Sequence, residues 1–158
     1  GGFRLMAHFR TSAVSPATAA EAFDFMANFQ NLADWDPGVS TSYRLDDGEI
    51  GIGSTFHVDS VIGPKTIPLV YEVVEYDAPR RIVLQASTGD FTSYDVLDVD
   101  EHEGGVVITY DATLTLHGYR RIFDPLLAAA FQIIGRRAAA GLTHAAAHLQ
   151  PVVIEVQK

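Results

Sequence analysis

The feature that most limits what this chain can fold into is a long amphipathic stripe near its C-terminus. Asp124-Pro125 is typical of a helix start, with an N-cap residue followed by proline in the first turn. Apolar residues then recur at spacings of three and four: Leu127, Phe131, Ile134, Ala138, Leu142, Ala145 and Leu149. A helix of about 25 residues is roughly 38 Å long. The pattern predicts one continuous helix from Asp124 to about Leu149, which must pack on a large apolar face formed by the preceding chain.

That face is predicted to be an antiparallel sheet. From Val39 to Leu116, short apolar runs alternate with turn signals such as Asp47-Gly48 and Gly104-Gly105, which indicates six strands in a meander. Ala7 to Val14 adds a seventh strand. The clearest alternation sets Val106, Ile108, Tyr110, Ala112, Leu114 and Leu116 against Thr109, Asp111, Thr113 and Thr115, and water is expected on the threonine face.

Two short helices are predicted between the first strand and the meander. Ser15-Pro16 is the predicted helix start. Its apolar stripe is Ala19, Ala22, Phe23 and Met26, and a second helical turn carries Phe29, Leu32 and Trp35. The segment is expected to end at Asp36-Pro37-Gly38.

Length and composition indicate one globular domain over 7–150. The 158 residues are 47% hydrophobic and 20% charged, and no apolar run reaches the length of a membrane span. A net charge of -9 disfavours nucleic acid as a partner. Residues 1–6 are interpreted as a tag remnant or an N-terminal extension, and 151–158 as a tail. Because no signal-peptide core is present, a cytoplasmic location is the expectation.

Several motifs resemble the SRPBCC superfamily, which includes START lipid-transfer domains, polyketide cyclase/dehydrase-like proteins and the major birch pollen allergen. They are the two helix starts together with Trp35-Asp36-Pro37-Gly38-Val39, Gly51-Ile52-Gly53-Ser54-Thr55-Phe56 and Tyr71-Glu72-Val73-Val74-Glu75-Tyr76-Asp77-Ala78-Pro79. The resemblance implies an α+β helix-grip fold, with a curved seven-stranded antiparallel sheet around the C-terminal helix. It also implies an elongated cavity between sheet and helix for a lipid, polyketide or aromatic metabolite.

Strand parity predicts which side chains face that cavity. The predicted lining residues are Trp35, Phe56, Val58, Tyr71, Val73, Ile108, Tyr110, Phe131 and Ile134. For Trp35 two interpretations stay open: its indole N–H orients a polar ligand group, or its ring anchors the short helix to the sheet. For the pair Asp34 and Asp36, an Asx-type turn and a solvated side chain are favoured over an acid and base pair.

No catalytic or metal-binding signature is found. His144 and His148 have metal-ligand spacing, but no acidic residue follows them in that helix, so no metal is expected. No cofactor is expected either. His57 and Asp59 are expected to face solvent, opposite Phe56, although the parity around His57 and Asp95 is not fixed by the pattern. The sequence has no nucleophile elbow and no phosphate-binding loop.

Three functions remain open from the sequence. The favoured one is a non-catalytic binder or carrier of a small hydrophobic molecule. The alternative is a polyketide cyclase/dehydratase-like enzyme that uses cavity tyrosines, Trp35 and a helix arginine. The third is an interaction module or a subunit of a homodimer. An ionisable residue with a shifted pKa inside the pocket would favour the enzyme, and an almost wholly apolar pocket would favour the carrier.

Overall fold

The computed structural model describes residues 6–62, 64–117 and 125–149, without the side chains of 62 and 125–131. Its main element is one sheet of seven strands in the order β1-β7-β6-β5-β4-β3-β2. Every neighbouring pair is antiparallel. The strands are β1 Met6–Ser15, β2 Val39–Arg44, β3 Thr55–Ile62, β4 Lys65–Asp77, β5 Arg81–Ser87, β6 Phe91–His102 and β7 Gly105–Leu116. This confirms the predicted seven-stranded antiparallel sheet, with six strands in a meander and the N-terminal strand as the seventh, and the α+β helix-grip fold.

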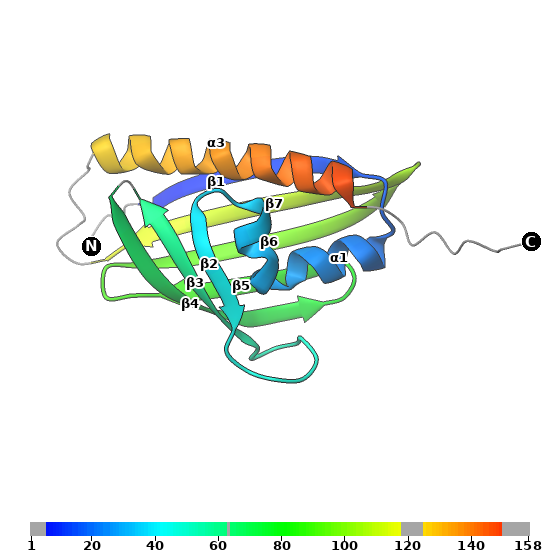
Figure 1. Ribbon diagram of the computed structural model, residues 1–158, viewed down its shortest axis with the longest axis horizontal. Helices are drawn as coiled ribbons and strands as arrows, with labels where there is room; N and C mark the ends of the chain where they lie inside the picture. The colour runs from blue at the N-terminus through cyan, green and yellow to red at the C-terminus, as the bar shows by residue number, and fades with distance from the viewer. Residues whose placement is uncertain (1–5, 63, 118–124, 150–158) are drawn as a thin grey trace, which may run out of the picture.

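The long helix α3, Pro125–His148, runs along the sheet beside β1 (Figure 1). It is continuous, as the apolar stripe predicted, and Ala138, Leu142 and Ala146 are buried on the side that faces the core. Asp124, the predicted N-cap, lies outside the described residues. No helix within the described ranges is long and apolar enough to cross a membrane.

Three short helical elements connect β1 to β2: α1 Ala19–Ala27, η1 Phe29–Asn31 and α2 Leu32–Trp35. The predicted stripe of α1 is buried, and so are Phe29 in η1 and Leu32 and Trp35 in α2. The predicted helix start at Ser15-Pro16 is wrong. β1 continues to Ser15, and Thr18 caps α1 by accepting a hydrogen bond from the Glu21 N–H at 3.2 Å. The Ser15 hydroxyl instead accepts from the Ala17 N–H at 3.2 Å, so it organises the turn before the helix.

Two glycines allow α3 to approach its neighbours closely. A Cβ atom at Gly141 would lie 1.8 Å from the carbonyl oxygen of Trp35, at the end of α2. A Cβ atom at Gly135 would lie 2.4 Å from the ring of Phe9 on β1. The backbone of α3 therefore rests directly on α2 and on the ring of Phe9 at these points, which fixes the position of the helix above the sheet.

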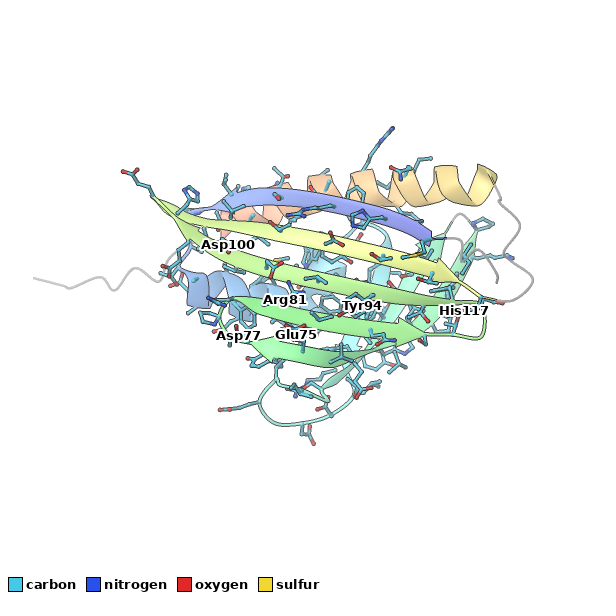
Figure 2. The ribbon with its side chains drawn as sticks, turned by 180° about the vertical axis from the view of Figure 1, so that it is seen from behind. Glu75, Asp77, Arg81, Tyr94, Asp100 and His117 are labelled. Atoms are coloured by element: carbon cyan, nitrogen blue, oxygen red, sulfur yellow. The ribbon has the colours of Figure 1, made fainter. Side chains whose placement is uncertain are left out.

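The convex face of the sheet is largely polar (Figure 2). Arg81 on β5 binds Glu75 on β4 and Asp98 on β6, each with a shortest N–O distance of 3.2 Å. His57 and Asp59 also share a face of β3 away from the buried Phe56, and they are bonded to each other at 2.8 Å. The expectation of water along the threonine face of β7 is wrong at Thr109, which is buried and lies 3.1 Å from the Ser12 hydroxyl of β1.

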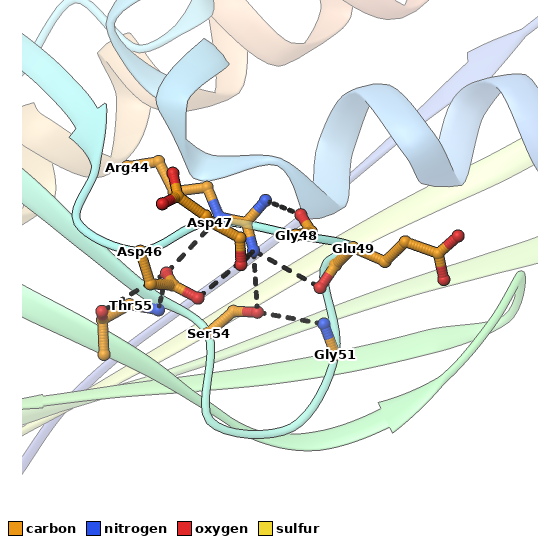
Figure 3. Close-up of polar contacts among 8 residues, drawn as sticks. All are labelled: Arg44, Asp46, Asp47, Gly48, Glu49, Gly51, Ser54 and Thr55. Carbon is orange, nitrogen blue, oxygen red and sulfur yellow. Dashed lines mark hydrogen bonds and ion pairs between the residues drawn. The ribbon is translucent and has the colours of Figure 1, made fainter.

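The loop between β2 and β3 is organised by a single arginine (Figure 3). The Arg44 guanidinium donates to the backbone carbonyls of Asp47, Gly48 and Glu49 and to the Asp46 carboxylate. Asp46 in turn accepts from the Thr55 N–H at 2.9 Å, and this bond together with Arg44 lowers the pKa of Asp46. The loop is therefore closed on itself by its own polar groups.

The concave face of the sheet is divided into two parts. Below α1 and η1 it is filled by aromatic packing: Phe29 lies 6.1 Å from Phe56 and 5.2 Å from Tyr71, and Phe23 lies 5.6 Å from Tyr76, between ring centroids. This packing belongs to the main hydrophobic core. The other part lies toward the start of β6 and the end of β7. No such aromatic packing fills it among the described residues, and it contains a cavity.

Candidate functional site: a cavity with a buried acidic end

The cavity between sheet and α3 has a volume of about 490 Å³, which is within the range of small-molecule sites. Most of its described wall is apolar: Phe9, Leu32, Val39, Val58, Ile67, Pro68, Leu69, Phe91, Ala112, Leu114, Leu116, Ile134, Gly135 and Ala138. The polar lining residues are Asp36, Ser60, Lys65, Tyr71, Thr88, Asp90, Ser93, Asp95 and Tyr110. Lys65 and Asp90 are exposed, whereas Asp36, Tyr71, Ser93, Asp95 and Tyr110 are buried.

The structure brings part of the predicted site together. Val58, Tyr71, Tyr110 and Ile134 line the cavity. Trp35, Phe56, Val73 and Ile108 are buried in the core and are not among the lining residues. The side chain of Phe131 lies outside the described part of the chain. The reason for the division is the packing of η1 and α1, which covers the end of the concave face where Phe56 and Val73 lie.

The polar end of the cavity is built around Asp95, which is 1% exposed. One carboxylate oxygen accepts a hydrogen bond from the Ser93 hydroxyl at 2.8 Å, and the other accepts from the Tyr110 hydroxyl. The Tyr71 hydroxyl donates to Ser93 at 3.1 Å. Four side chains from β4, β6 and β7 therefore form one connected network, which we call the Asp95 network.

The two tyrosines of this network are held from behind by aromatic rings. Trp35 on α2 packs edge-on against Tyr110 with 5.8 Å between ring centroids. Phe29 on η1 packs edge-on against Tyr71 at 5.2 Å. Of the two interpretations left open for Trp35, the described contacts favour the anchoring role, because its ring supports a lining tyrosine and is not itself a lining residue.

Asp36 adds a second buried carboxyl group to the same cavity. The expected Asx-type turn is present, since Oδ1 accepts from the Gly38 N–H at 2.8 Å. Asp34 is exposed, which agrees with the expected solvated side chain, whereas Asp36 is only 8% exposed and lines the cavity. The reason is that the turn bond and the burial of the adjacent Trp35 hold the carboxyl group inward.

Burial shifts the protonation of both acids. It raises the pKa of Asp95 from its ordinary value of 3.8 to about 6, against the hydrogen bonds from Tyr110 and Ser93, which act in the opposite direction. Burial also raises the pKa of Asp36 from 3.8 to about 6, against the bond from Gly38. The pKa values of Tyr71 and Tyr110 are raised well above 10 by burial and by the nearby Asp95 charge. The cavity thus contains two carboxyl groups with a pKa of about 6.

The sequence does contain information on which face of the sheet Asp95 occupies, and it lies in the length of the β6–β7 hairpin. β6 and β7 are joined by a tight turn in which His102 pairs with Gly105, and counting back along the ladder pairs Asp95 with Ala112. Residues that pair directly across an antiparallel ladder share a face, and the alternation of β7 places Ala112 on the inner face. The length of the hairpin therefore fixes Asp95 as inward-facing.

The histidines do not contribute to the cavity wall among the described residues. The His148 ring nitrogen Nδ1 lies 2.7 Å from the backbone carbonyl of His144, one turn earlier in α3. In the described ranges there is no group of three or more His, Asp or Glu side chains that could hold a metal ion.

A curved antiparallel sheet that encloses a ligand-sized cavity with a long C-terminal helix defines a helix-grip protein. A family model described as "Polyketide cyclase / dehydrase and lipid transport" matches residues 6–150. The chain belongs to this family, and the predicted SRPBCC membership is confirmed. A search of curated proteins gives no match.

Solved structures show the same fold at low identity. The Zhui aromatase/cyclase from Streptomyces sp. R1128 aligns with a TM-score of 0.70 and 12% identity, covering 90% of this chain and 92% of that one. A START superfamily protein from Mycobacterium smegmatis aligns with a TM-score of 0.68 and 12% identity, covering 91% and 97%. The di-domain ARO/CYC BexL from the BE-7585A biosynthetic pathway aligns with a TM-score of 0.66 and 17% identity over 93% of this chain, which spans only 52% of that protein.

Proposed function

We propose that this protein binds a small, mainly apolar molecule in the cavity between the sheet and α3. The observation that carries the proposal is the cavity itself: about 490 Å³ of space whose wall is mostly apolar, with a small cluster of buried polar groups at one end. Binding sites for small molecules commonly combine an apolar wall with a few placed polar groups that orient the ligand. Membership of a family described by polyketide cyclisation and lipid transport supports the same function.

A cavity-filling variant tests this proposal. Ala112 lines the cavity, whereas Val73, which strand parity placed on the same face, is packed in the core and is less suitable. We expect wild-type protein to bind a neutral fluorescent dye such as Nile red with saturable stoichiometry near one, and Ala112→Phe to bind it at least about tenfold more weakly. The added ring occupies ligand space, and overpacking of this kind typically costs about 1 to 3 kcal/mol in stability.

The matched control is Thr113→Phe, which adds the same ring on the opposite face of β7, where residue 113 pairs with His8 and Tyr94. This variant should bind the dye as the wild type does. Equal binding by Ala112→Phe, with its fold intact by circular dichroism, would refute the cavity as the binding site.

A second candidate is a cyclase/dehydratase-like enzyme acting in the same cavity. It is favoured by one observation, that the carboxyl groups of Asp36 and Asp95 both have a pKa of about 6 and line one cavity. An acid and a base that titrate near neutral pH are suited to proton transfer. Mass spectrometry of a bound ligand, recovered after incubation with the protein, separates the two functions. A carrier returns the ligand with its mass unchanged, whereas an enzyme converts it into a product.

A further inference from the structure

The hydrogen bonds inside the Asp95 network determine what it offers to a ligand. Each of its three hydroxyl groups has one hydrogen, and each hydrogen is already used. Tyr71 donates to Ser93, and both Ser93 and Tyr110 donate to Asp95. These groups can therefore offer a ligand only acceptor positions. They are the lone pairs of the two tyrosine oxygens and the remaining lone pairs of the Asp95 carboxylate.

Asp36 presents the same kind of group. Its Oδ1 accepts from the Gly38 N–H, and within the described part of the chain no hydrogen bond reaches Oδ2. Both buried acids and both tyrosines are therefore hydrogen-bond acceptors toward the cavity. Lys65, the one cation among the described lining residues, is exposed at the start of β4 and does not belong to this buried end.

We propose that the polar end of the ligand is a hydrogen-bond donor, a hydroxyl or an amine, and that molecules ending in a carboxylate or lacking a donor are selected against. This inference rests on the proposed ligand-binding function. A ligand O–H or N–H satisfies the free acceptors at the acidic end, whereas an ether leaves them unpaired once water is expelled. A carboxylate adds a third negative charge beside two buried ones, which is strongly unfavourable at low dielectric.

Four probes that each contain a ten-carbon chain test the inference: decanol, decylamine, decanoate and decyl methyl ether, each measured by displacement of Nile red at neutral pH. We expect decanol, decylamine or both to bind roughly tenfold or more tighter than the ether and decanoate, which corresponds to one hydrogen bond to a charged acceptor. The relative affinities of decanol and decylamine show whether the donor is a hydroxyl or an amine.

Variants at the two acids give a sharper test. Asp36→Asn keeps an oxygen for the Gly38 N–H but presents an NH₂ donor to the cavity, so the preference for decanol over the ether should fall severalfold, and decanoate should gain. Asp95→Asn is the second variant and should act in the same direction if the first fails to fold. Asp100→Asn removes an exposed carboxylate from β6 (Figure 2) and should leave the probe order unchanged.

The outcomes separate this inference from the function on which it rests. If all four probes displace the dye equally, or decanoate binds tightest, and Ala112→Phe still abolishes binding, the donor preference is wrong and the cavity function stands. If neither the dye nor any probe binds to folded wild-type protein, both are wrong.

Discussion

Replacing Gly141 by alanine should destabilise the protein by about 3 kcal/mol or more. A Cβ atom there would lie 1.8 Å from the Trp35 carbonyl oxygen and 3.0 Å from its carbon, and neither backbone atom can rotate away. The helix α3 or the α2 segment must therefore move, and overpacking of this kind typically costs 1 to 3 kcal/mol and sometimes more. The loss would occur despite the gain of up to about 1 kcal/mol that alanine usually brings to a helix interior.

The measurement is the urea unfolding midpoint at constant m-value. Thr143→Ala is the matched control, since it places alanine at an exposed position two residues further along the same helix, and its effect should stay within about 0.5 kcal/mol. If Gly141→Ala were as stable as the wild type, α3 could not rest on the Trp35 carbonyl as described. Trp35 packs against Tyr110, so displacement of Trp35 would also disturb Tyr110 in the cavity wall. This variant therefore tests whether the position of α3 affects the candidate site.

The second large effect is on the pH dependence of stability. Asp36 and Asp95 have a pKa of about 6 in the folded protein against 3.8 as the ordinary value. Between about pH 4 and 6 the folded state retains protons that the unfolded state has lost, so the free energy of unfolding should fall as pH rises through this window and level off above it. A shift of this size corresponds to an energy on the order of 3 kcal/mol for each group.

The two contributions are not simply additive, because the charge of Asp36 also raises the pKa of Asp95. Asp95→Asn should therefore flatten much of the slope, and Asp36→Asn combined with it should flatten most of the rest. Asp46 shifts in the opposite direction and acts below this window, where its stabilising contribution is lost as pH falls. A wild-type protein that gains stability from pH 4 to 6, or an unchanged slope in Asp95→Asn, would contradict the buried acidic end.

The fold could be predicted from the sequence because its signals are long and mutually consistent. The stripe of α3 and the alternation of β7 each extend over many residues, so errors of one position do not change the element. The start of α1 was missed for a local reason. Ser15-Pro16 and Thr18 are both good helix starts, and the pairing of Ser15 with Val106 in the sheet decides between them.

The candidate site was harder to predict, because it depends on which part of the concave face is filled. Strand parity correctly brings Phe56 and Tyr71 to one side, yet only packing shows that Phe29 covers Phe56 and that Tyr71 borders the cavity. Asp95 is absent from the predicted lining residues because the sequence pattern leaves its strand parity open. Its inward position follows from the β6–β7 register, which the hairpin turn sets.

The central claim is that ligand occupies the space enclosed by the sheet and α3, and methyl chemical-shift mapping tests it most directly. Leu69 and Val70 are neighbours on β4 that lie on opposite faces: Leu69 lines the cavity and is 5% exposed, whereas Val70 is 52% exposed. As decanol is added, the methyl signals of Leu69 and Val58 should shift with the same saturable curve, and those of Val70 should not move. Saturable shifts at Val70 with none at Leu69 and Val58 would place the ligand on the outer face and contradict the account.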